Sequence, residues 1–455
     1  MTEKEAVMDK PIKKKAINRL STMYPLRNLV NEAYLRTLMA SQAGEPTAWS
    51  MLTWWQGDVI LKAMGIEVVY PENYATIAAS MGQAERYMNL ADADGFPSHM
   101  CGYARTTIGY TYRMMRETNG QIPPEAPLGG MAKPTVLVGA GTACDARFKW
   151  FQSLGRYLDL PMWVLELPHL GVYELMDEGM EDHAIRFVVK ELESFIGFLE
   201  RATGRKLDWD RMEEFLHYGI EIQKVFFEMD ELRKRRPCPM HSSDFWSSMP
   251  AALFLSGDPA VALKLYRDMR QEIAERVVKG IAGINAPEKY RLMFVELPPW
   301  HSLRFFDDLA ERGWNFVMES RSYHPVAPFD LEKISNPLEK IARICLRFIH
   351  GYHNQARQEG ISYAFVMPYL EYARSFHCDG AFLHPLLTCR MASSHLKSLE
   401  ETLLKRIKVP SLIAEGDIVD IRLFNPAQTL TRAEAFEATM DYYRRIRQEE
   451  GNTYD

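Results

Sequence analysis

Short apolar runs alternate with amphipathic segments along this chain, and this alternation restricts the possible folds more than any other feature. The pattern occurs three times, and each time a segment with the helical period of apolar residues separates two apolar runs. The paired runs are 135–141 with 161–167, 291–297 with 314–320, and 379–385 with 411–417. Strands that are apolar throughout and separated by helices are typical of parallel sheets with helices on both faces. The sequence therefore predicts an α/β fold.

Two similar phrases indicate that the α/β part is duplicated. VLELPHL at 164–170 resembles MFVELPPW at 293–300, although chance similarity of strand–helix junctions is the alternative. The junction after the run at 135–141 carries Cys144, whereas the junction after 291–297 carries Pro298, Pro299 and Trp300. We take the second junction as the equivalent of the first, which predicts that the fold does not require a cysteine there.

Other stretches outline the organisation of the chain. Residues 181–235 are helical in pattern with a break at 202–208, residues 258–281 form another long helical pattern, and the Pro/Gly-rich stretch 119–134 is typical of a linker. We expect a disordered tail at 1–15, a mostly helical N-terminal region at 16–130, a first α/β half with a helical insert at 131–285, and a second α/β half at 286–455.

The composition excludes several classes of protein. Of the 455 residues 47% are hydrophobic and 25% charged, and a net charge of −6 argues against nucleic acid as a main partner. No apolar run approaches the roughly 18 residues of a membrane span, and the first residues lack the apolar core of a secretory signal. We therefore expect a cytoplasmic protein that binds no membrane, in which the six cysteines are thiols or ligands rather than disulfides.

Three of the cysteines fall at predicted helix N-termini. Cys144 and Cys389 each follow a predicted strand at the carboxyl edge of a sheet, and Cys101 follows a turn and opens a helical pattern. Free N–H groups at such positions stabilise a thiolate or an anionic ligand set, and backbone N–H nests recur at iron–sulfur sites. Cys345 has the helical spacing of a core residue, Cys238 lies in a loop between prolines, and Cys378 is at the opposite edge of the sheet from Cys389.

The candidate site has alternative interpretations. The cysteines 101, 144 and 389 could be ordinary small residues in tight loops, and the arginines that follow them, Arg105, Arg147 and Arg390, could be exposed helix residues or could compensate the charge of a cluster or phosphate. Gly139 and Gly141 with Glu166 could instead bind a dinucleotide, but Cys144 replaces the third glycine of that fingerprint. For proton donors, no choice is made among the candidates His99, His324 and His384.

Several stretches together resemble the family of 2-hydroxyacyl-CoA dehydratases and benzoyl-CoA reductases. They are WWQGDVILKAMGIEVVYPENYA at 54–75, FPSHMCGYARTTIG at 96–109, GTACDARFKWFQ at 141–152 and DGAFLHPLLTCRMASSH at 379–395. The resemblance covers nearly the whole chain and implies tandem Rossmann-like or flavodoxin-like halves. It also implies a [4Fe–4S] cluster between them, held by Cys101, Cys144 and Cys389. Three thiolates leave one iron of such a cluster open to a substrate or water.

The same resemblance implies the partners and the reaction. It predicts a heterodimer with a homologous iron–sulfur subunit, and a separate iron–sulfur activator that hydrolyses ATP and delivers a low-potential electron to act on an acyl-CoA. This chain has no GxxxxGK[ST] loop, in agreement with ATP binding on another subunit. Dehydratases of the family often follow the third cysteine with Asp-Pro, whereas here Arg390 and Met391 follow Cys389. The resemblance is therefore greatest to a benzoyl-CoA reductase subunit, with a dehydratase subunit or a non-catalytic electron-relay subunit as alternatives.

Overall fold

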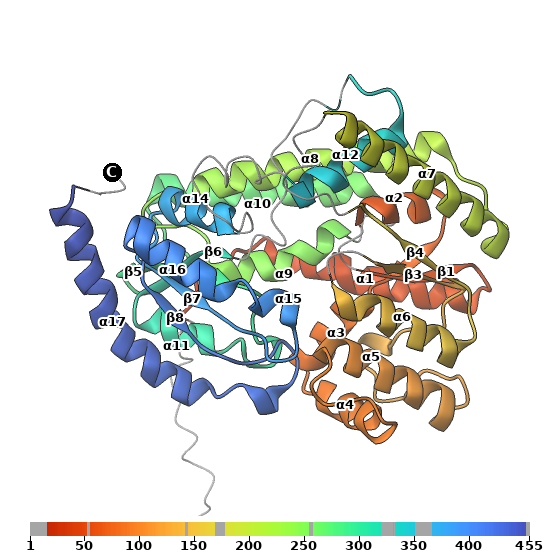
Figure 1. The fold of residues 1–455 in the computed structure, drawn as a ribbon, viewed down its shortest axis with the longest axis horizontal. Helices are drawn as coiled ribbons and strands as arrows, with labels where there is room; N and C mark the ends of the chain where they lie inside the picture. Colours follow the sequence, from red (N-terminus) through yellow and green to blue (C-terminus); the bar gives the residue numbers. More distant parts are fainter. Residues whose placement is uncertain are drawn as a thin grey trace, which may run out of the picture.

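The fold was obtained as a computed structural model, which describes residues 16–51, 55–141, 144–168, 178–253, 258–319, 331, 333–350 and 366–451. The predicted tail at 1–15 and the candidate His324 lie outside these described residues. Two four-stranded parallel sheets form the framework, one in each half of the chain (Figure 1). The expected α/β class with parallel sheets is confirmed.

The first sheet has the strand order β2-β1-β3-β4. Its strands are β1 (Thr47–Ser50), β2 (Glu67–Val69), β3 (Val136–Ala140) and β4 (Met162–Leu165). All residues of β3 are buried, which explains its uninterrupted apolar sequence. The first sheet thus combines β1 and β2, from the stretch 16–130, with the two strands predicted from 135–141 and 161–167.

The second sheet repeats this topology, because its order β6-β5-β7-β8 places the four strands in the same relative sequence. Its strands are β5 (Tyr290–Val295), β6 (Trp314–Glu319), β7 (Gly380–Leu383) and β8 (Ser411–Ile413). An order of 2-1-3-4 is that of the flavodoxin-like fold, in which ligands bind beyond the carboxyl ends of the strands where the order reverses. The two halves are therefore tandem repeats of one topology.

This topology corrects the equivalence that the sequence suggested. The similar phrases at 164–170 and 293–300 begin within β4 and β5, which along the chain are the last strand of one sheet and the first strand of the other. The strand equivalent to β3 is β7, so the partner of the Cys144 junction is the Cys389 junction rather than Pro298–Trp300. The predicted equivalence was wrong because similar sequences occur at the ends of non-equivalent strands, and only the hydrogen-bond pairing of the strands shows which of them are equivalent.

Helices surround both sheets. The first half contributes α1 (Met23–Gln42), α2 (Trp55–Ala63), α3 (Pro71–Ser80), α4 (Ala84–Ala93), α5 (Gly102–Tyr112) and α6 (Asp145–Leu158). The second half contributes α11 (Phe305–Glu311), α12 (Pro337–His350), α14 (Met367–Ser375), α15 (Arg390–Ser393), α16 (Leu396–Ile407) and α17 (Pro426–Glu449).

A helical segment separates the halves along the chain, as the sequence predicted for 181–235 and 258–281. It consists of α7 (Glu178–Thr203), α8 (Trp209–Arg233), α9 (Ser242–Leu253) and α10 (Pro259–Lys279). The long helices α8 and α10 pack together along one side of the molecule (Figure 1). Asp208 and Asp258 cap α8 and α10 by accepting hydrogen bonds from first-turn N–H groups.

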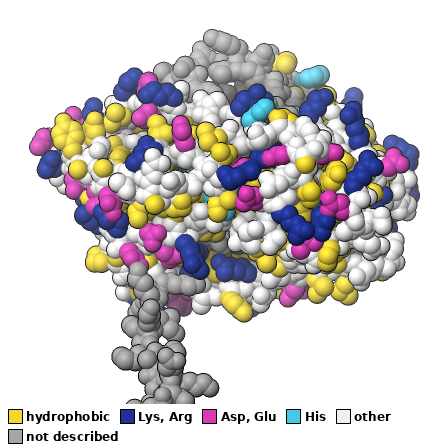
Figure 2. Space-filling model, turned by 90° about the horizontal axis from the view of Figure 1, so that it is seen from below, with side chains coloured by type: hydrophobic (Ala, Val, Ile, Leu, Met, Phe, Trp, Pro, Cys, Tyr) yellow, Lys and Arg dark blue, Asp and Glu magenta, His cyan; other side chains and the backbone are white. Residues whose placement is uncertain are grey.

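The surface carries charges of both signs. On the face seen in Figure 2, basic and acidic side chains intermix with scattered apolar ones. Among the helices of the described segments, none is long and apolar enough to cross a membrane.

Candidate functional site

Three cysteines from distant parts of the chain occupy helix N-cap positions. Cys101 precedes α5, Cys144 precedes α6 and Cys389 precedes α15. Their placement at helix starts agrees with the sequence prediction, and all three residues are partly exposed. Cys144 and Cys389 follow the equivalent strands β3 and β7 and so lie where the strand order of each sheet reverses, whereas Cys101 comes from the loop between α4 and α5.

The three thiols are close enough to influence one another electrostatically. Burial raises the pKa of Cys101 well above its ordinary value, and repulsion from Cys389 and Cys144 adds to the effect. Burial also raises the pKa of Cys389 to about 12, with further repulsion from Cys144 and from Glu296. The fold thus brings together the three sulfur atoms that the sequence singled out.

Backbone N–H groups oppose this rise at two of the sulfurs. The N–H of Ala104 acts to lower the pKa of Cys101, and the N–H of Ala392 does the same for Cys389. Neither sulfur has the geometry of a full capping hydrogen bond. These donors favour an anionic sulfur without fully compensating for burial.

The remaining cysteines are structural. Cys345 lies 5% exposed in the core, where burial raises its pKa to about 12. Cys238 and Cys378 are completely buried in the core of the second half, and burial raises their pKa to about 11 and about 12. The prediction of core and loop roles for these residues agrees with their positions.

The arginines that follow the cysteines differ in environment. Arg105 is completely buried and pairs with Asp92 and Asp420, and Arg147 pairs with Glu72 at 2.9 Å. Arg147 also acts to lower the pKa of Cys389, so its charge is felt at the candidate site. Arg390 is exposed. Arg105 and Arg147 thus have carboxylate partners and join structural elements.

The two histidine candidates within the described residues differ in environment. His99 is exposed, and His384 is completely buried, with its Nδ1 2.8 Å from the carbonyl oxygen of Ala414. Burial lowers the pKa of His384 to about 4, so this ring is neutral near pH 7.

A buried acid–base pair near Cys389 was missed from the sequence. Glu296 follows β5, is 5% exposed, and has a backbone φ of +80°, an uncommon conformation for a residue other than glycine. Its Oε1 lies 3.1 Å from Nε2 of His395, whose ring stacks on Tyr369. The position of Glu296 at the carboxyl end of a parallel strand is the signal that could have identified it.

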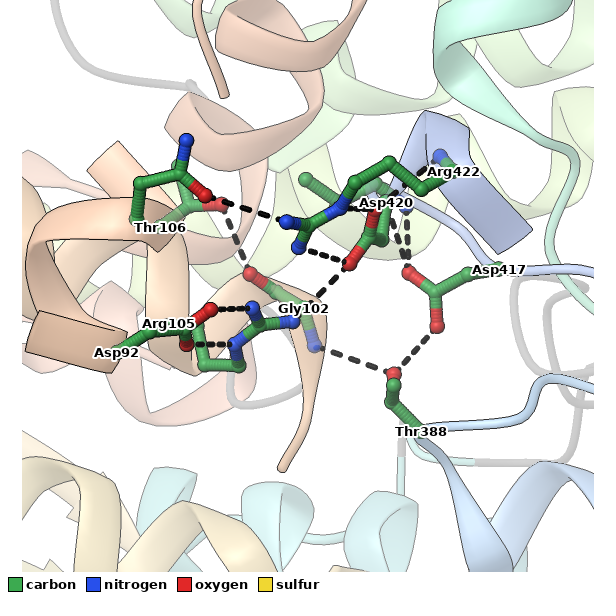
Figure 3. Close-up of polar contacts among 10 residues, drawn as sticks. Asp92, Gly102, Arg105, Thr106, Thr388, Asp417, Asp420 and Arg422 are labelled. Carbon is green, nitrogen blue, oxygen red and sulfur yellow. Dashed lines mark hydrogen bonds and ion pairs between the residues drawn. The ribbon is translucent and has the colours of Figure 1, made fainter. Parts of the chain in front are cut away.

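A second group of polar residues connects the loops that carry Cys101 and Cys389. Gly102, Thr388 and Asp417 are joined by hydrogen bonds, and Arg105, Asp92, Asp420 and Arg422 lie beside them (Figure 3). This group could not be predicted from the sequence either, because its members are up to 330 residues apart along the chain, from Asp92 to Arg422.

The glycine turn after β3 is unfavourable for a dinucleotide. A Cβ atom on Gly141 would lie 2.1 Å from a carboxylate oxygen of Glu166. The acidic residue thus occupies the space beside the second glycine, where a pyrophosphate would have to approach the backbone. Within the described part of the chain, no three His, Cys, Asp or Glu side chains are arranged to hold a single metal ion.

Comparison with known proteins agrees with this architecture. The family model of the 2-hydroxyglutaryl-CoA dehydratase D-component matches residues 57–438. The (R)-phenyllactyl-CoA dehydratase alpha subunit of Clostridium sporogenes is 25% identical over 429 residues, which are 94% of this chain and 97% of that protein. A benzoyl-CoA reductase subunit of Thauera aromatica is 25% identical over 443 residues, 93% of this chain and 95% of that protein. The (R)-2-hydroxyglutaryl-CoA dehydratase alpha subunit of Acidaminococcus fermentans is 21% identical, over 91% of this chain and 96% of that protein.

The family match includes three of the four strands of the first sheet, all four strands of the second, the helices between the sheets and the three cysteines. Because it covers far more than half of the chain, the resemblance seen in the sequence is confirmed. The chain belongs to the family of the 2-hydroxyglutaryl-CoA dehydratase D-component, to which subunits of 2-hydroxyacyl-CoA dehydratases and of benzoyl-CoA reductase are related.

Proposed function

We propose that Cys101, Cys144 and Cys389 hold a [4Fe–4S] cluster in a subunit of an enzyme complex that acts on an acyl-CoA thioester. The observation that carries the proposal is that three separate helix starts present three thiols within electrostatic range of one another. Burial and repulsion disfavour free thiolates at Cys101 and Cys389, and iron would relieve both effects by displacing the protons.

The chemistry of the donor set fits a cluster better than a single ion. All three donors are sulfur, which is the ligand that iron–sulfur clusters prefer, and three thiolates would leave one iron open. When bound, the cluster would supply electrons at very low potential to the thioester. The residues of this chain would hold the sulfurs in place and direct the N–H groups of Ala104 and Ala392 towards them.

Dehydration of a 2-hydroxyacyl-CoA is the first candidate reaction. The relatives include dehydratase alpha subunits that align over nine-tenths or more of this chain. Reduction of an aromatic acyl-CoA is the second candidate, supported by the relationship to the benzoyl-CoA reductase of Thauera aromatica and by Arg390 directly after the third cysteine. Either reaction calls for a homologous second subunit and an ATP-hydrolysing iron–sulfur activator as partners.

Anaerobic purification with iron and sulfide analysis tests the site. The single variants Cys101→Ser, Cys144→Ser and Cys389→Ser are expected to lose most of the bound iron. Cys345→Ser is the matched control because it is a buried core thiol away from the site, and it should keep the full iron content. Full iron in any of the three site variants would refute the assignment of that ligand.

An assay of the complete complex separates the two reactions. The complex, with activator and ATP, is offered a 2-hydroxyacyl-CoA and benzoyl-CoA in parallel under anaerobic conditions. Formation of an enoyl-CoA identifies the dehydratase, and loss of the aromatic absorption of benzoyl-CoA identifies the reductase. A complex with full iron that converts neither class of thioester would contradict the proposed function.

A further inference from the structure

We propose that Asp417 is a positioning residue that acts through Thr388 to hold the Cys101 and Cys389 loops at a set spacing. Its buried negative charge also makes a cluster bound there harder to reduce. This inference rests on the proposed function, because it concerns residues that surround the three cysteines. It adds a contact between the two halves of the chain that the cysteines themselves do not provide.

A chain of hydrogen bonds joins the two cysteine loops. The backbone N–H of Gly102, directly after Cys101, donates to Oγ1 of Thr388 at 3.2 Å. The same hydroxyl donates a hydrogen bond to Oδ2 of Asp417 (Figure 3). Because Gly102 directly follows Cys101 and Thr388 directly precedes Cys389, the hydrogen bond between them joins the immediate neighbours of two candidate ligands.

Asp417 is itself held rigidly. Its Oδ1 accepts hydrogen bonds from the backbone N–H groups of Val419 and Asp420, both at 2.9 Å, and its side chain is completely buried. A carboxyl group that only accepts hydrogen bonds, at both oxygens, has the pattern of an ionised carboxylate. The hydroxyl proton of Thr388 is thereby directed to Asp417, which leaves the oxygen lone pairs to face Gly102.

Close packing reinforces the contact at Gly102. A Cβ atom on this residue would lie 2.8 Å from Oδ1 of Asp417 and 3.1 Å from Cβ of Val419. The start of α5 therefore fits against the loop after β8 with no room for a side chain. Movement of either loop would change the position of Cys101 relative to Cys389.

A group of ion pairs around the buried Arg105 joins the same elements a second time. Arg105, one turn into α5, donates to Asp92 at 2.8 and 2.5 Å and to Asp420 at 3.1 Å. Asp420 also accepts from Arg422 at 2.7 and 2.6 Å. Asp420 thereby fixes the loop that contains Asp417. The hydrogen bonds from Gly102 through Thr388 to Asp417 are therefore anchored to a loop whose position is fixed.

The charge of Asp417 reaches the site. Oδ1 of Asp417 would be 2.8 Å from a Cβ atom on Gly102, the residue directly after Cys101. The reduction potential of an iron–sulfur cluster depends on local charge, hydrogen bonding and exposure, and a buried negative charge opposes the addition of an electron. The two effects of Asp417 can be tested separately, because positioning depends on the hydroxyl group of Thr388 and the charge belongs to the carboxylate of Asp417.

Two variants of the complete complex, purified anaerobically, test the inference. Asp417→Asn removes the charge but keeps the shape, and is expected to shift the midpoint potential of the cluster to more positive values at unchanged iron content. Thr388→Val removes the link but keeps the charge, and is expected to release iron to a chelator several-fold faster and to alter the EPR spectrum of the reduced cluster. Thr388→Ser, which restores a hydroxyl, should recover the behaviour of the native chain.

Thr429→Val is the matched control. Thr429 is 6% exposed against 8% for Thr388, and its hydroxyl donates to the carbonyl of Asn425 at 2.9 Å within α17, so its loss should leave potential and iron release unchanged. Unchanged potential in Asp417→Asn together with unchanged iron release in Thr388→Val would overturn the inference. If Asp417→Asn does not fold, Thr388→Val alone tests the inference. Iron release and an EPR spectrum equal to those of the native chain in Thr388→Val would then show that Thr388 does not hold the two cysteine loops. Native protein without iron would instead refute the proposed function, so the two failures are distinguishable.

Discussion

Glu296 combines an unfavourable backbone conformation with a buried carboxylate. Glu296 adopts a left-handed backbone conformation while its carboxylate is buried beside His395. Such a conformation costs about 1–3 kcal/mol and, where it persists, is concentrated at functional sites. Glu296 also repels the Cys389 thiolate, which places this strained carboxylate next to the candidate cluster.

We therefore expect Glu296→Gln to lower turnover of the complete complex by about 10²-fold or more, the usual contribution of an acid–base group. Iron content should remain that of the native chain, because the amide keeps the size of the side chain. Turnover and iron are measured on the same preparation. Parallel loss of both would show that Glu296 only supports the fold around Cys389.

Gly109 illustrates the structural use of a glycine. A Cβ atom there would lie 1.8 Å from the backbone carbonyl oxygen of Tyr87 on α4, a contact that no side-chain movement can relieve. Gly109→Ala is expected to destabilise the protein by about 3 kcal/mol, at the upper end of the usual cost of overpacking. Denaturant unfolding measures this loss. Gly44→Ala provides a contrast because its Cβ would enter open space, so only the strain of its φ of +75° would be felt.

Individual helices depend on residues far away for their ends. The start of α1 is capped by Glu272 of α10, whose carboxylate accepts hydrogen bonds from the N–H groups of Ser21 and Thr22 at 2.8 and 3.0 Å. Burial alone would raise the pKa of Glu272, but the hydrogen bonds from Ser21 and Thr22 outweigh it and lower the pKa. A carboxylate between two helices thus replaces the local capping residue.

Glu272→Gln is expected to cost about 1–2 kcal/mol of unfolding free energy, since it weakens charge-assisted bonds to four donors. The contribution has a defined pH dependence. Because the folded-state pKa is depressed, the stabilisation is present above the ordinary value of 4.5 and is lost as the pH falls below it. Unfolding curves at pH 7 and pH 4 should therefore differ less for the variant than for the native chain.

The molecule as a whole depends on buried groups that must remain neutral. Burial lowers the pKa of His241 well below its ordinary value, with added repulsion from Arg19 and Arg233 and a smaller opposing attraction from Glu319. Burial also lowers the pKa of His384 to about 4, with a small contribution from His301. Both rings lie in the second half of the molecule, around the sheet that presents Cys389.

Global stability should therefore fall as the pH drops from about 6.5 to about 4. In this range the unfolded chain takes up protons that the buried rings of the folded chain do not, so stability rises with pH. Denaturant midpoints across this range measure the slope. His384→Gln should flatten it. An identical slope in that variant would show that other groups control the acid response.

Most of the strands and helices could be predicted from the sequence alone. The runs at 135–141, 291–297 and 379–385 became β3, β5 and β7, and the helical patterns at 181–235 and 258–281 became α7, α8 and α10. The positions of Cys101, Cys144 and Cys389 at helix starts could also be predicted, since strand–helix junctions depend on near neighbours.

Contacts between segments that are distant along the chain could be identified only from the tertiary structure. Hydrogen-bond pairing showed that Cys389, not Pro298–Trp300, is the counterpart of Cys144. Packing brought Thr388 to Gly102 across 286 residues of the chain, and Glu296 to His395 across 99 residues. Periodicity and capping depend on residues within one or two turns, so a single sequence contains them. The choice of contact partners depends on how all the elements pack together, and that information is not local.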